Sequence, residues 1–235
     1  MASPRKVEKV TIIVPVKDEE VGLEFLLRDF RSSPITQLYD VQFIFVIDIR
    51  TSDSSKKVAS EFSDNIIDQK ETTGKASAVK QAVESWKKNP TSKVIFLDAD
   101  ASYSFDSVIK VLDSLDNDVD VVSGSRFLSN KKSPKGMSRL HIIGNRALSM
   151  ISSIRNRRRI SDLCTGLWGF NSRSLLKMEL MSKGFDLEAE IAGLARKKNL
   201  KHSEIEVNWS QRKGGTSKLR SLTDGFIIFL RIIRT

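Results

Sequence analysis

Short apolar runs alternate with amphipathic stretches through the first part of the chain. The runs are rich in β-branched and aromatic residues, as buried strands are, and they occupy residues 10–15, 41–47, 65–67 and 94–97. Between them apolar side chains recur at helical spacing, over residues 20–31, 52–62 and 74–86. Strands that alternate with helices in this way predict a doubly wound, mostly parallel α/β sheet.

The pattern is less regular in the second half of the chain. Apolar runs over residues 119–126 and 204–209 predict two further strands. Helical spacing over residues 139–154 and 184–198 predicts two helices, and the first of them is amphipathic. No internal repeat, low-complexity segment or linker separates these elements from the first half, so we expect a single domain over residues 1–235.

Composition adds one constraint, which is charge. The 235 residues are 40% hydrophobic and 29% charged, as is ordinary for a globular protein, but the net charge is +10. Such an excess indicates an anionic partner: nucleic acid, a phospholipid surface or a phosphorylated substrate. The single cysteine, Cys164, excludes an intramolecular disulfide and a cysteine-rich zinc site, and is typical of a reducing compartment.

Neither a signal peptide nor a membrane-spanning segment is expected. Residues 1–9 are polar and lack the apolar core of a signal peptide. A spanning helix needs about 18 or more consecutive apolar residues. The longest candidate, residues 226–233, is shorter and contains Arg231. Any membrane contact is therefore expected to be peripheral.

Two aspartates provide the first candidate for chemistry. Asp98 and Asp100 directly follow the strand predicted over residues 94–97. Ligands of open α/β sheets collect outside the carboxyl ends of the strands. Two carboxylates at such a place can share Mg²⁺ or Mn²⁺, and the cation can hold a diphosphate. Aspartate also commonly ends strands and caps helices, so the neighbouring motifs must decide between these interpretations.

Polar motifs recur at the ends of the other predicted strands. In chain order they are Pro15-Val16-Lys17-Asp18-Glu19, Asp48 with Asp53, Gly74-Lys75 and Asp98-Ala99-Asp100. This ordered series resembles the nucleotide-sugar domain of glycosyltransferase family 2. Later motifs resemble the polyprenyl-phosphate branch of that family, of the dolichyl-phosphate mannose synthase type: Gly124-Ser125-Arg126, Asp162-Leu163-Cys164-Thr165-Gly166, Glu190, and Arg212 with Gly215, Ser217, Lys218 and Leu219. The resemblance extends over about residues 8–220.

The resemblance implies a fold and a reaction. The fold would be the GT-A-like nucleotide-sugar fold, with a nucleotide-sugar half over about residues 8–125 and an acceptor half over about residues 126–235. The reaction would be the metal-dependent, inverting transfer of a hexose from a donor of the GDP-mannose or UDP-glucose type to a dolichyl or polyprenyl phosphate. Inversion implies direct in-line displacement without a covalent sugar–enzyme intermediate.

The resemblance also assigns roles to individual residues. The metal ligands would be Asp98 and Asp100. The donor would contact Pro15, Glu19, Asp48, Lys75 and Asp98. The acceptor phosphate would be held by Arg126, Arg139, Arg212, Ser217 and Lys218. The catalytic groups would be Asp100, Arg212, Lys218 and Glu190.

The chain departs from the family pattern at two positions. Family members usually carry a second aspartate and a glycine after the equivalent of Asp48, where this chain has Ile49 and Arg50. The polyprenyl branch often has glutamine two residues beyond the second metal aspartate, where this chain has Ser102. The chain therefore lacks a usual nucleoside contact and the glutamine that often serves as a further protein ligand for the metal.

Two other functions remain open at this stage. A soluble family member with a hydroxyl acceptor would need Glu190 or Asp186 as a general base, because an alcohol must lose its proton to attack. A phosphate monoester, with a second pKa of about 6, is already largely dianionic, and Glu190 would then orient sugar hydroxyls instead. A nucleic-acid-binding protein would explain the net charge but not the carboxylates at strand ends.

The acceptor half contains the features expected of a peripheral membrane protein. The amphipathic helix over residues 139–154 and the apolar tail over residues 222–233 are expected to lie in the membrane interface. The basic cluster at residues 155–159 would be attracted to anionic lipid by about 1 kcal/mol per basic residue. We therefore expect a cytoplasmic protein, peripheral on the cytosolic face of the membrane.

Overall fold

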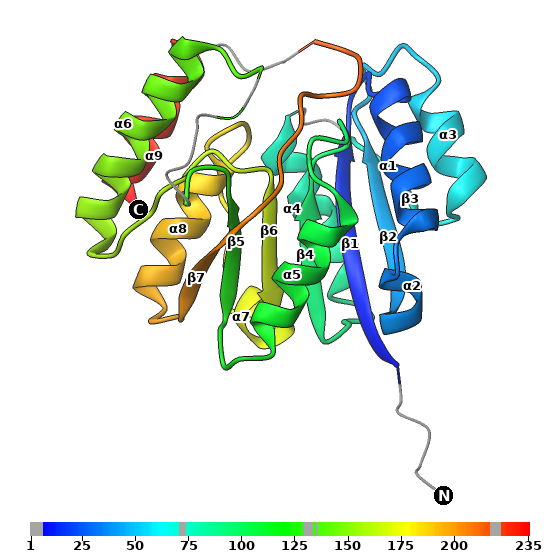
Figure 1. Ribbon diagram of the computed structural model, residues 1–235, viewed down its shortest axis with the longest axis horizontal. Coiled ribbons are helices and arrows are strands. Elements are labelled where there is room, and N and C mark those ends of the chain that lie inside the picture. The colour runs from blue at the N-terminus through cyan, green and yellow to red at the C-terminus, as the bar shows by residue number, and fades with distance from the viewer. Residues whose placement is uncertain (1–6, 71–73, 129–133, 135, 217–221) are drawn as a thin grey trace, which may run out of the picture.

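One seven-stranded sheet forms the centre of the molecule (Figure 1). A computed structural model describes residues 7–70, 74–128, 134, 136–216 and 222–235. Across these residues the strands are β1 (Glu8–Val16), β2 (Tyr39–Ile47), β3 (Ile66–Asp68), β4 (Lys93–Leu97), β5 (Val121–Ser125), β6 (Leu167–Asn171) and β7 (His202–Glu206). Their spatial order is β3-β2-β1-β4-β6-β5-β7. All pairs are parallel except those of β6, which runs antiparallel between β4 and β5.

Helices cover both faces of the sheet. One face packs against α1 (Glu20–Ser32), α2 (Ile35–Leu38), α3 (Ser55–Phe62) and α5 (Phe105–Leu115). The other face packs against α4 (Lys75–Trp86), α7 (Ser172–Leu176), α8 (Leu187–Lys197) and α9 (Thr223–Arg234). Helix α6 (Arg139–Asn156) lies beside α8 and α9 at one side of the molecule (Figure 1).

Burial on both faces explains the continuous apolar runs in the sequence. Along β1, Val10, Ile12 and Val14 belong to the core on one face, whereas Ile13 belongs to the core on the other. Parallel strands covered on both sides read as apolar throughout because successive side chains point to opposite faces. Each fully buried side chain of this kind stabilises the fold by about 1.5–3 kcal/mol.

The direction of chain progression reverses between β1 and β4. From β1 the chain continues outward through β2 and β3, and then returns to place β4 on the other side of β1. In open α/β sheets, such a switch point opens a crevice outside the carboxyl ends of the strands. The segments that follow β1 and β4, which contain Glu19 and Asp98, therefore meet at one edge of the sheet.

The predicted fold class, a doubly wound and mostly parallel sheet, is confirmed. Four elements, α2, α5, β6 and α7, were not predicted. Strand β6 contains Gly169, and in a sequence a glycine more often indicates a loop than a strand. A Cβ at this position would lie 2.3 Å from Cγ1 of Val111 on α5. The close packing of α5 on the sheet requires this glycine.

Several predicted boundaries were wrong by a few residues. The strand predicted over residues 204–209 is β7, which begins at His202 and ends at Glu206. Trp209 forms only an isolated bridge with Tyr103. The helix predicted from residue 184 begins at Leu187, because residues 181–186 form a turn held by buried carboxylates.

Candidate functional site

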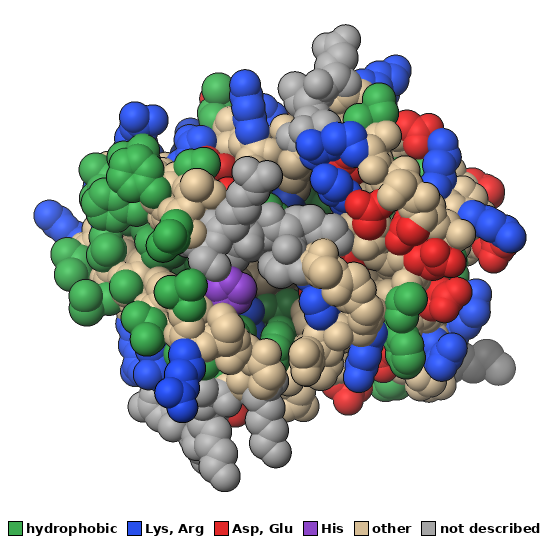
Figure 2. Space-filling view, turned by 90° about the horizontal axis from the view of Figure 1, so that it is seen from above, with side chains coloured by type: hydrophobic (Ala, Val, Ile, Leu, Met, Phe, Trp, Pro, Cys, Tyr) green, Lys and Arg blue, Asp and Glu red, His purple; other side chains and the backbone are tan. Residues whose placement is uncertain are grey.

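A cleft of about 810 Å³ opens at the edge of the sheet where β1, β2 and β4 end. Seen from above that edge, the surface is hollowed near its middle, hydrophobic side chains gather at the left and charged side chains predominate at the right (Figure 2). Eight of the residues predicted from the sequence line the cleft: Pro15, Glu19, Asp48, Lys75, Asp98, Asp100, Arg126 and Arg212. The fold thus brings together residues from both halves of the chain.

The Asp98–Asp100 turn is fixed by close backbone packing. A Cβ on Gly22 of α1 would lie 2.8 Å from the carbonyl oxygen of Ala99. A Cβ on Gly166 would lie 1.9 Å from Oδ2 of Asp98. The amide of Ser102 donates to Oδ1 of Asp100 over 3.0 Å. The turn can occupy this position because Gly22 and Gly166, on two neighbouring segments, have no side chains. Both aspartates line the cleft.

The two aspartates fit a divalent cation that substrate oxygens complete. The described part of the chain contains no group of three or more acidic, histidine or cysteine side chains arranged to hold a metal. Mg²⁺ in phosphate-transferring sites is commonly held by one or two carboxylates together with substrate phosphates and water. Asp98 and Asp100 provide such a partial set, with Ser102 also lining the cleft.

Lys75 lies between two carboxylates at the floor of the cleft. Its Nζ is 2.6 Å from Oδ1 of Asp98 and 2.7 Å from Oε1 of Glu188. Burial alone would lower the pKa of Lys75, but these two carboxylates outweigh it and raise that pKa above its ordinary value. Burial also raises the pKa of the Glu188 carboxyl, although Lys75 acts in the opposite direction. A lasting positive charge therefore lies beside the aspartate turn.

Asp48 and Arg50 form a two-point ion pair at the end of β2. Oδ1 of Asp48 accepts hydrogen bonds from the backbone amide and Nε of Arg50, at 2.9 and 3.0 Å, and Oδ2 accepts one from Nη2 at 3.0 Å. Burial tends to raise the pKa of Asp48, but the bonds from Arg50 prevail and hold it below its ordinary value. Asp48 is buried and Arg50 is half-exposed at the cleft wall. Arg50 thus occupies both oxygens of the carboxylate that the resemblance assigns to the nucleoside.

Arg212 joins the late loop of the chain to the end of β1. Its Nη2 donates to Oε1 of Glu19 over 2.5 Å, and its Nε donates to the carbonyl of Gly214 over 3.0 Å. Nη1 lies 4.0 Å from Oδ2 of Asp100. A guanidinium therefore lies next to the predicted metal ligands.

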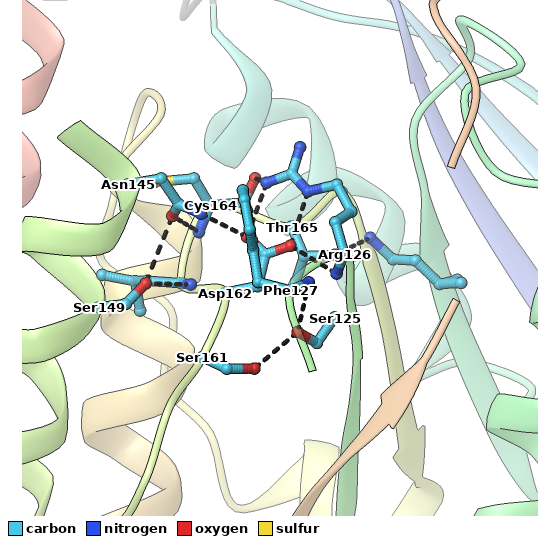
Figure 3. A network of polar contacts seen from close by, with 12 residues as sticks. Ser125, Arg126, Phe127, Asn145, Ser149, Ser161, Asp162, Cys164 and Thr165 are labelled. Atoms are coloured by element: carbon cyan, nitrogen blue, oxygen red, sulfur yellow. Dashed lines mark hydrogen bonds and ion pairs between the residues drawn. The ribbon is translucent and has the colours of Figure 1, made fainter. Parts of the chain in front are cut away.

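Arg126 is held by a buried network (Figure 3). Its Nε and Nη2 donate to the two oxygens of Asp162 at 2.6 and 2.7 Å, and Nη2 also donates to the carbonyl of Cys164 at 2.7 Å. Asn145 on α6 donates to the same carboxylate over 2.8 Å. Among the residues drawn in Figure 3, the third guanidinium nitrogen of Arg126 has no partner. The network thus links the end of β5, α6 and the segment that enters β6, and leaves one donor of Arg126 for a ligand.

Four predicted site residues do not line the cleft or lie outside the described residues. Arg139 is exposed at the start of α6. Glu190 is buried on α8, where its two oxygens accept hydrogen bonds from the amides of Met181 and Ser182 at 2.9 Å each. Ser217 and Lys218 lie outside the described residues.

Sequence reasoning missed Glu188 and Asp162 as members of the site. Glu188 and Glu190 are two residues apart, so they lie on roughly opposite sides of α8, and only one can face the cleft. The structure turns Glu188 toward Lys75. Asp162 was part of a quoted motif, but its pairing with Arg126 spans 36 positions and had no local signal.

The comparisons with known proteins agree with this site. Residues 11–178 match the model of glycosyl transferase family 2, so the chain belongs to this family and is a glycosyltransferase. It is 29% identical over 97% of its length to glycosyltransferase AglJ of Haloferax volcanii, and spans 72% of that protein. It is 25% identical over 92% of its length to a dolichol-phosphate mannosyltransferase of Pyrococcus furiosus, and spans 60% of it.

A solved structure with the same fold is glucosyl-3-phosphoglycerate synthase from Mycobacterium tuberculosis, in complex with Mn²⁺, UDP and phosphoglyceric acid. The TM-score is 0.72 at 12% identity, over 96% of this chain and 76% of that one. At this identity the likeness concerns the fold, and it agrees with the GT-A-like architecture predicted from the sequence.

Proposed function

We propose that the protein transfers a hexose, with inversion, from a nucleoside diphosphate sugar to a polyprenyl phosphate at a membrane surface. The observation that carries this proposal is the change of chemistry along the cleft. One end is lined by Asp98, Asp100 and Lys75, and the other by apolar residues of α6 and α9, namely Leu140, Leu148, Leu222 and Ile228. A charged donor and an extremely apolar acceptor can meet only in a site of this kind.

The donor would occupy the end of the cleft near β1 and β2. Pro15, Glu19 and Asp48 line this end and would surround the nucleoside. The positive charge of Lys75 lies beside Asp98 and would hold the diphosphate. Mg²⁺ or Mn²⁺ on Asp98 and Asp100 would neutralise the diphosphate as the leaving group.

The acceptor phosphate would lie between the donor and the apolar end. Arg212, 4.0 Å from Asp100, would grip it with parallel hydrogen bonds, and Arg126 would contribute its remaining donor. Arg139, Ser217 and Lys218 complete the proposed acceptor set. Holding a phosphate oxygen in line with the sugar lowers the barrier through positioning and electrostatics.

The position of the acidic residues supports a phosphate acceptor over a hydroxyl acceptor. Glu190 and Asp186, the two candidates for a general base, do not line the cleft, and Glu188 is paired with Lys75. A phosphate oxygen needs no base because it is already ionised near neutral pH. Names of relatives agree: a second Haloferax volcanii protein, 25% identical over 97% of the chain, is a dolichyl-phosphate hexose transferase.

Helix α6 supports contact with a lipid surface because its amphipathic pattern is inverted. Its buried residues are the polar Asn145, Ser149, Ser152 and Asn156. Four of its apolar residues are exposed, Leu140 by 57%, Ile143 by 66%, Met150 by 61% and Ile154 by 73%, while Leu148 and Ile151 pack against the core. Phe226 and Ile227 of α9 extend this exposed apolar surface, which Figure 2 shows at the left. Exposed apolar surface of this extent marks an interaction site, and the exposed Arg157 and Arg159 favour an anionic partner.

We propose peripheral contact with the cytosolic face of the membrane through this surface. Across the described residues, no helix combines the length and the apolar character needed to cross a bilayer. The apolar faces of α6 and α9 would lie at the depth of the lipid headgroups, where the isoprenoid chain can leave the bilayer and enter the cleft.

One experiment tests the reaction directly. The protein is incubated with Mn²⁺, a polyprenyl phosphate and a panel of labelled GDP- and UDP-sugars, with Asp100→Asn as the control. We expect label to enter the organic phase from one donor with the wild type and not with the variant. Transfer only to water or to a soluble alcohol, or no transfer while Mn²⁺ still binds, would refute the lipid acceptor.

A further inference from the structure

Arg231 connects the lipid-side helix α9 to two buried carboxylates. Its Nε and Nη2 each lie 2.7 Å from Oδ2 of Asp186, and its Nη1 lies 3.5 Å from Oε1 of Glu190. The side chains of Asp186 and Glu190 are only 6% and 4% exposed. Arg231 is thus the cation that compensates two negative charges beneath the cleft.

The same carboxylates hold the turn at residues 181–186. Glu190 accepts hydrogen bonds from the amides of Met181 and Ser182 at 2.9 Å each. Oδ1 of Asp186 accepts one from the amide of Gly184 at 3.2 Å. The conformation of this turn therefore depends on the two acids that Arg231 neutralises.

The turn at residues 181–186 also holds the start of α4. The amides of Ala76 and Ser77 donate to the carbonyls of Gly184 and Lys183, each over 3.3 Å. Gly74 has a φ of +110°, and a Cβ on it would lie 2.5 Å from the carbonyl oxygen of Lys183. The turn therefore packs directly against the residue before Lys75, with no space for a side chain between them.

We infer that Arg231 is a positioning residue for the donor site, which couples the seating of α9 to the placement of Lys75. This inference rests on the proposed function, because Lys75 is assigned there to the donor diphosphate. The path runs from Arg231 through Asp186 and Glu190 to the turn, and from the turn to Gly74 and Lys75. Helix α9, which is proposed to contact lipid, would thus also set the geometry at the polar end of the cleft.

Removing the guanidinium would leave the two buried carboxylates without an ion-pair partner among the described residues. Such groups repel one another and draw in water, so the turn that they hold would open. The start of α4 would lose its fixed partner, and donor affinity would fall. Acceptor affinity depends on other side chains and would change less.

Calorimetry with Mn²⁺ and a nucleoside diphosphate, without acceptor, measures this effect. We expect Arg231→Gln to weaken nucleotide binding about 10-fold, and Arg231→Lys to recover part of it because lysine restores the charge but not the fork. The matched control is Arg234→Gln, an exposed arginine on the same helix, which should bind like the wild type. Hydrogen exchange should accelerate at residues 181–186 and 74–77 in Arg231→Gln alone.

The outcomes separate this inference from the proposed function. A folded Arg231→Gln protein that melts at a lower temperature but binds nucleotide like the wild type would overturn the positioning role. Should that variant not fold, Arg231→Lys with unchanged nucleotide binding and unchanged exchange would overturn it equally. A wild type that binds no nucleotide would refute the proposed function, and exchange at residues 74–77 would still decide the coupling.

Discussion

The Nζ atom of Lys75 lies 2.6 Å from Oδ1 of Asp98. The first residue of α4 thus contacts the carboxylate that directly follows β4. The contact puts a cation where a metal-bound diphosphate would lie. On its other side the lysine is held by Glu188, 2.7 Å away. The two carboxylates raise the pKa of Lys75 above its ordinary value despite burial, so the lysine stays charged.

Lys75→Met should weaken donor binding about 10-fold, because the lysine supplies a point charge to the diphosphate. It should also destabilise the fold by about 3 kcal/mol, because Glu188 would be buried without a partner. The double variant Lys75→Met with Glu188→Gln should recover stability without recovering donor binding. Calorimetric titration and urea unfolding measure the two effects, and joint recovery of both would exclude a direct role for the lysine.

Asp100→Asn should reduce turnover at least 100-fold with little change in melting temperature, since loss of a metal ligand removes several kcal/mol of charge stabilisation. Electron paramagnetic resonance of free Mn²⁺ gives a second readout, in which the variant should leave more of the metal unbound. The exposed Asp106→Asn serves as the matched control. Equal Mn²⁺ binding by the wild type and Asp100→Asn would remove this aspartate from the metal site.

Gly166→Ala should displace Asp98, because the new methyl group would lie 1.9 Å from Oδ2 of that carboxylate. We expect Mn²⁺ and donor affinity to fall together while the far-ultraviolet circular dichroism stays unchanged. Gly144→Ala provides the contrast, as nothing lies within 4 Å of its Cβ, and it should stabilise α6 by about 1 kcal/mol. Wild-type metal binding by Gly166→Ala would show that the turn tolerates the shift.

Arg50→Gly should change the preference between donor nucleotides. The variant removes the two guanidinium bonds to Asp48, each 3.0 Å long, so Oδ2 becomes free while Oδ1 keeps its bond to the backbone amide of residue 50. It also restores the residue type that family members carry at this position. Ratios of kcat/KM for GDP- and UDP-sugars should move at least 5-fold, equivalent to about 1 kcal/mol. Identical ratios would mean that Arg50 is only a partner for Asp48 and does not contact the base.

His202 predicts a specific acid sensitivity. Burial, with a smaller effect of Arg158, lowers the pKa of His202 to about 3 from an ordinary 6.5, so the folded imidazole stays neutral where the unfolded one gains a proton. Its contribution to stability is complete above pH 6.5 and is lost as pH falls toward 3, by up to about 1.4 kcal/mol per pH unit. Urea unfolding between pH 7.5 and 4.5 should show a shallower decline for His202→Gln than for the wild type, and an equal decline in both would contradict this role.

The sequence was sufficient where strands are buried on both faces and end in polar motifs. Val94–Leu97 followed by Asp98 is such a case. A strand buried on both faces is apolar throughout, and the residues that follow it at the edge of the sheet are polar. It was insufficient for β6 and for the pairs Lys75–Glu188 and Arg126–Asp162, which join residues 113 and 36 positions apart. Such pairs depend on tertiary packing and leave no periodic signal.

The antiparallel direction of β6 determines which part of the second half of the chain reaches the cleft. Leu167, at the start of β6, pairs with Leu97, at the end of β4. The loop before β6 therefore lies at the same edge of the sheet as the loops that follow the parallel strands. Thr165 and Gly166 therefore face the aspartate turn although they precede their strand. Changes in that entering loop would therefore act on the cleft directly while the strand pairs of β4 stay in place, which makes the loop a natural place to redesign specificity.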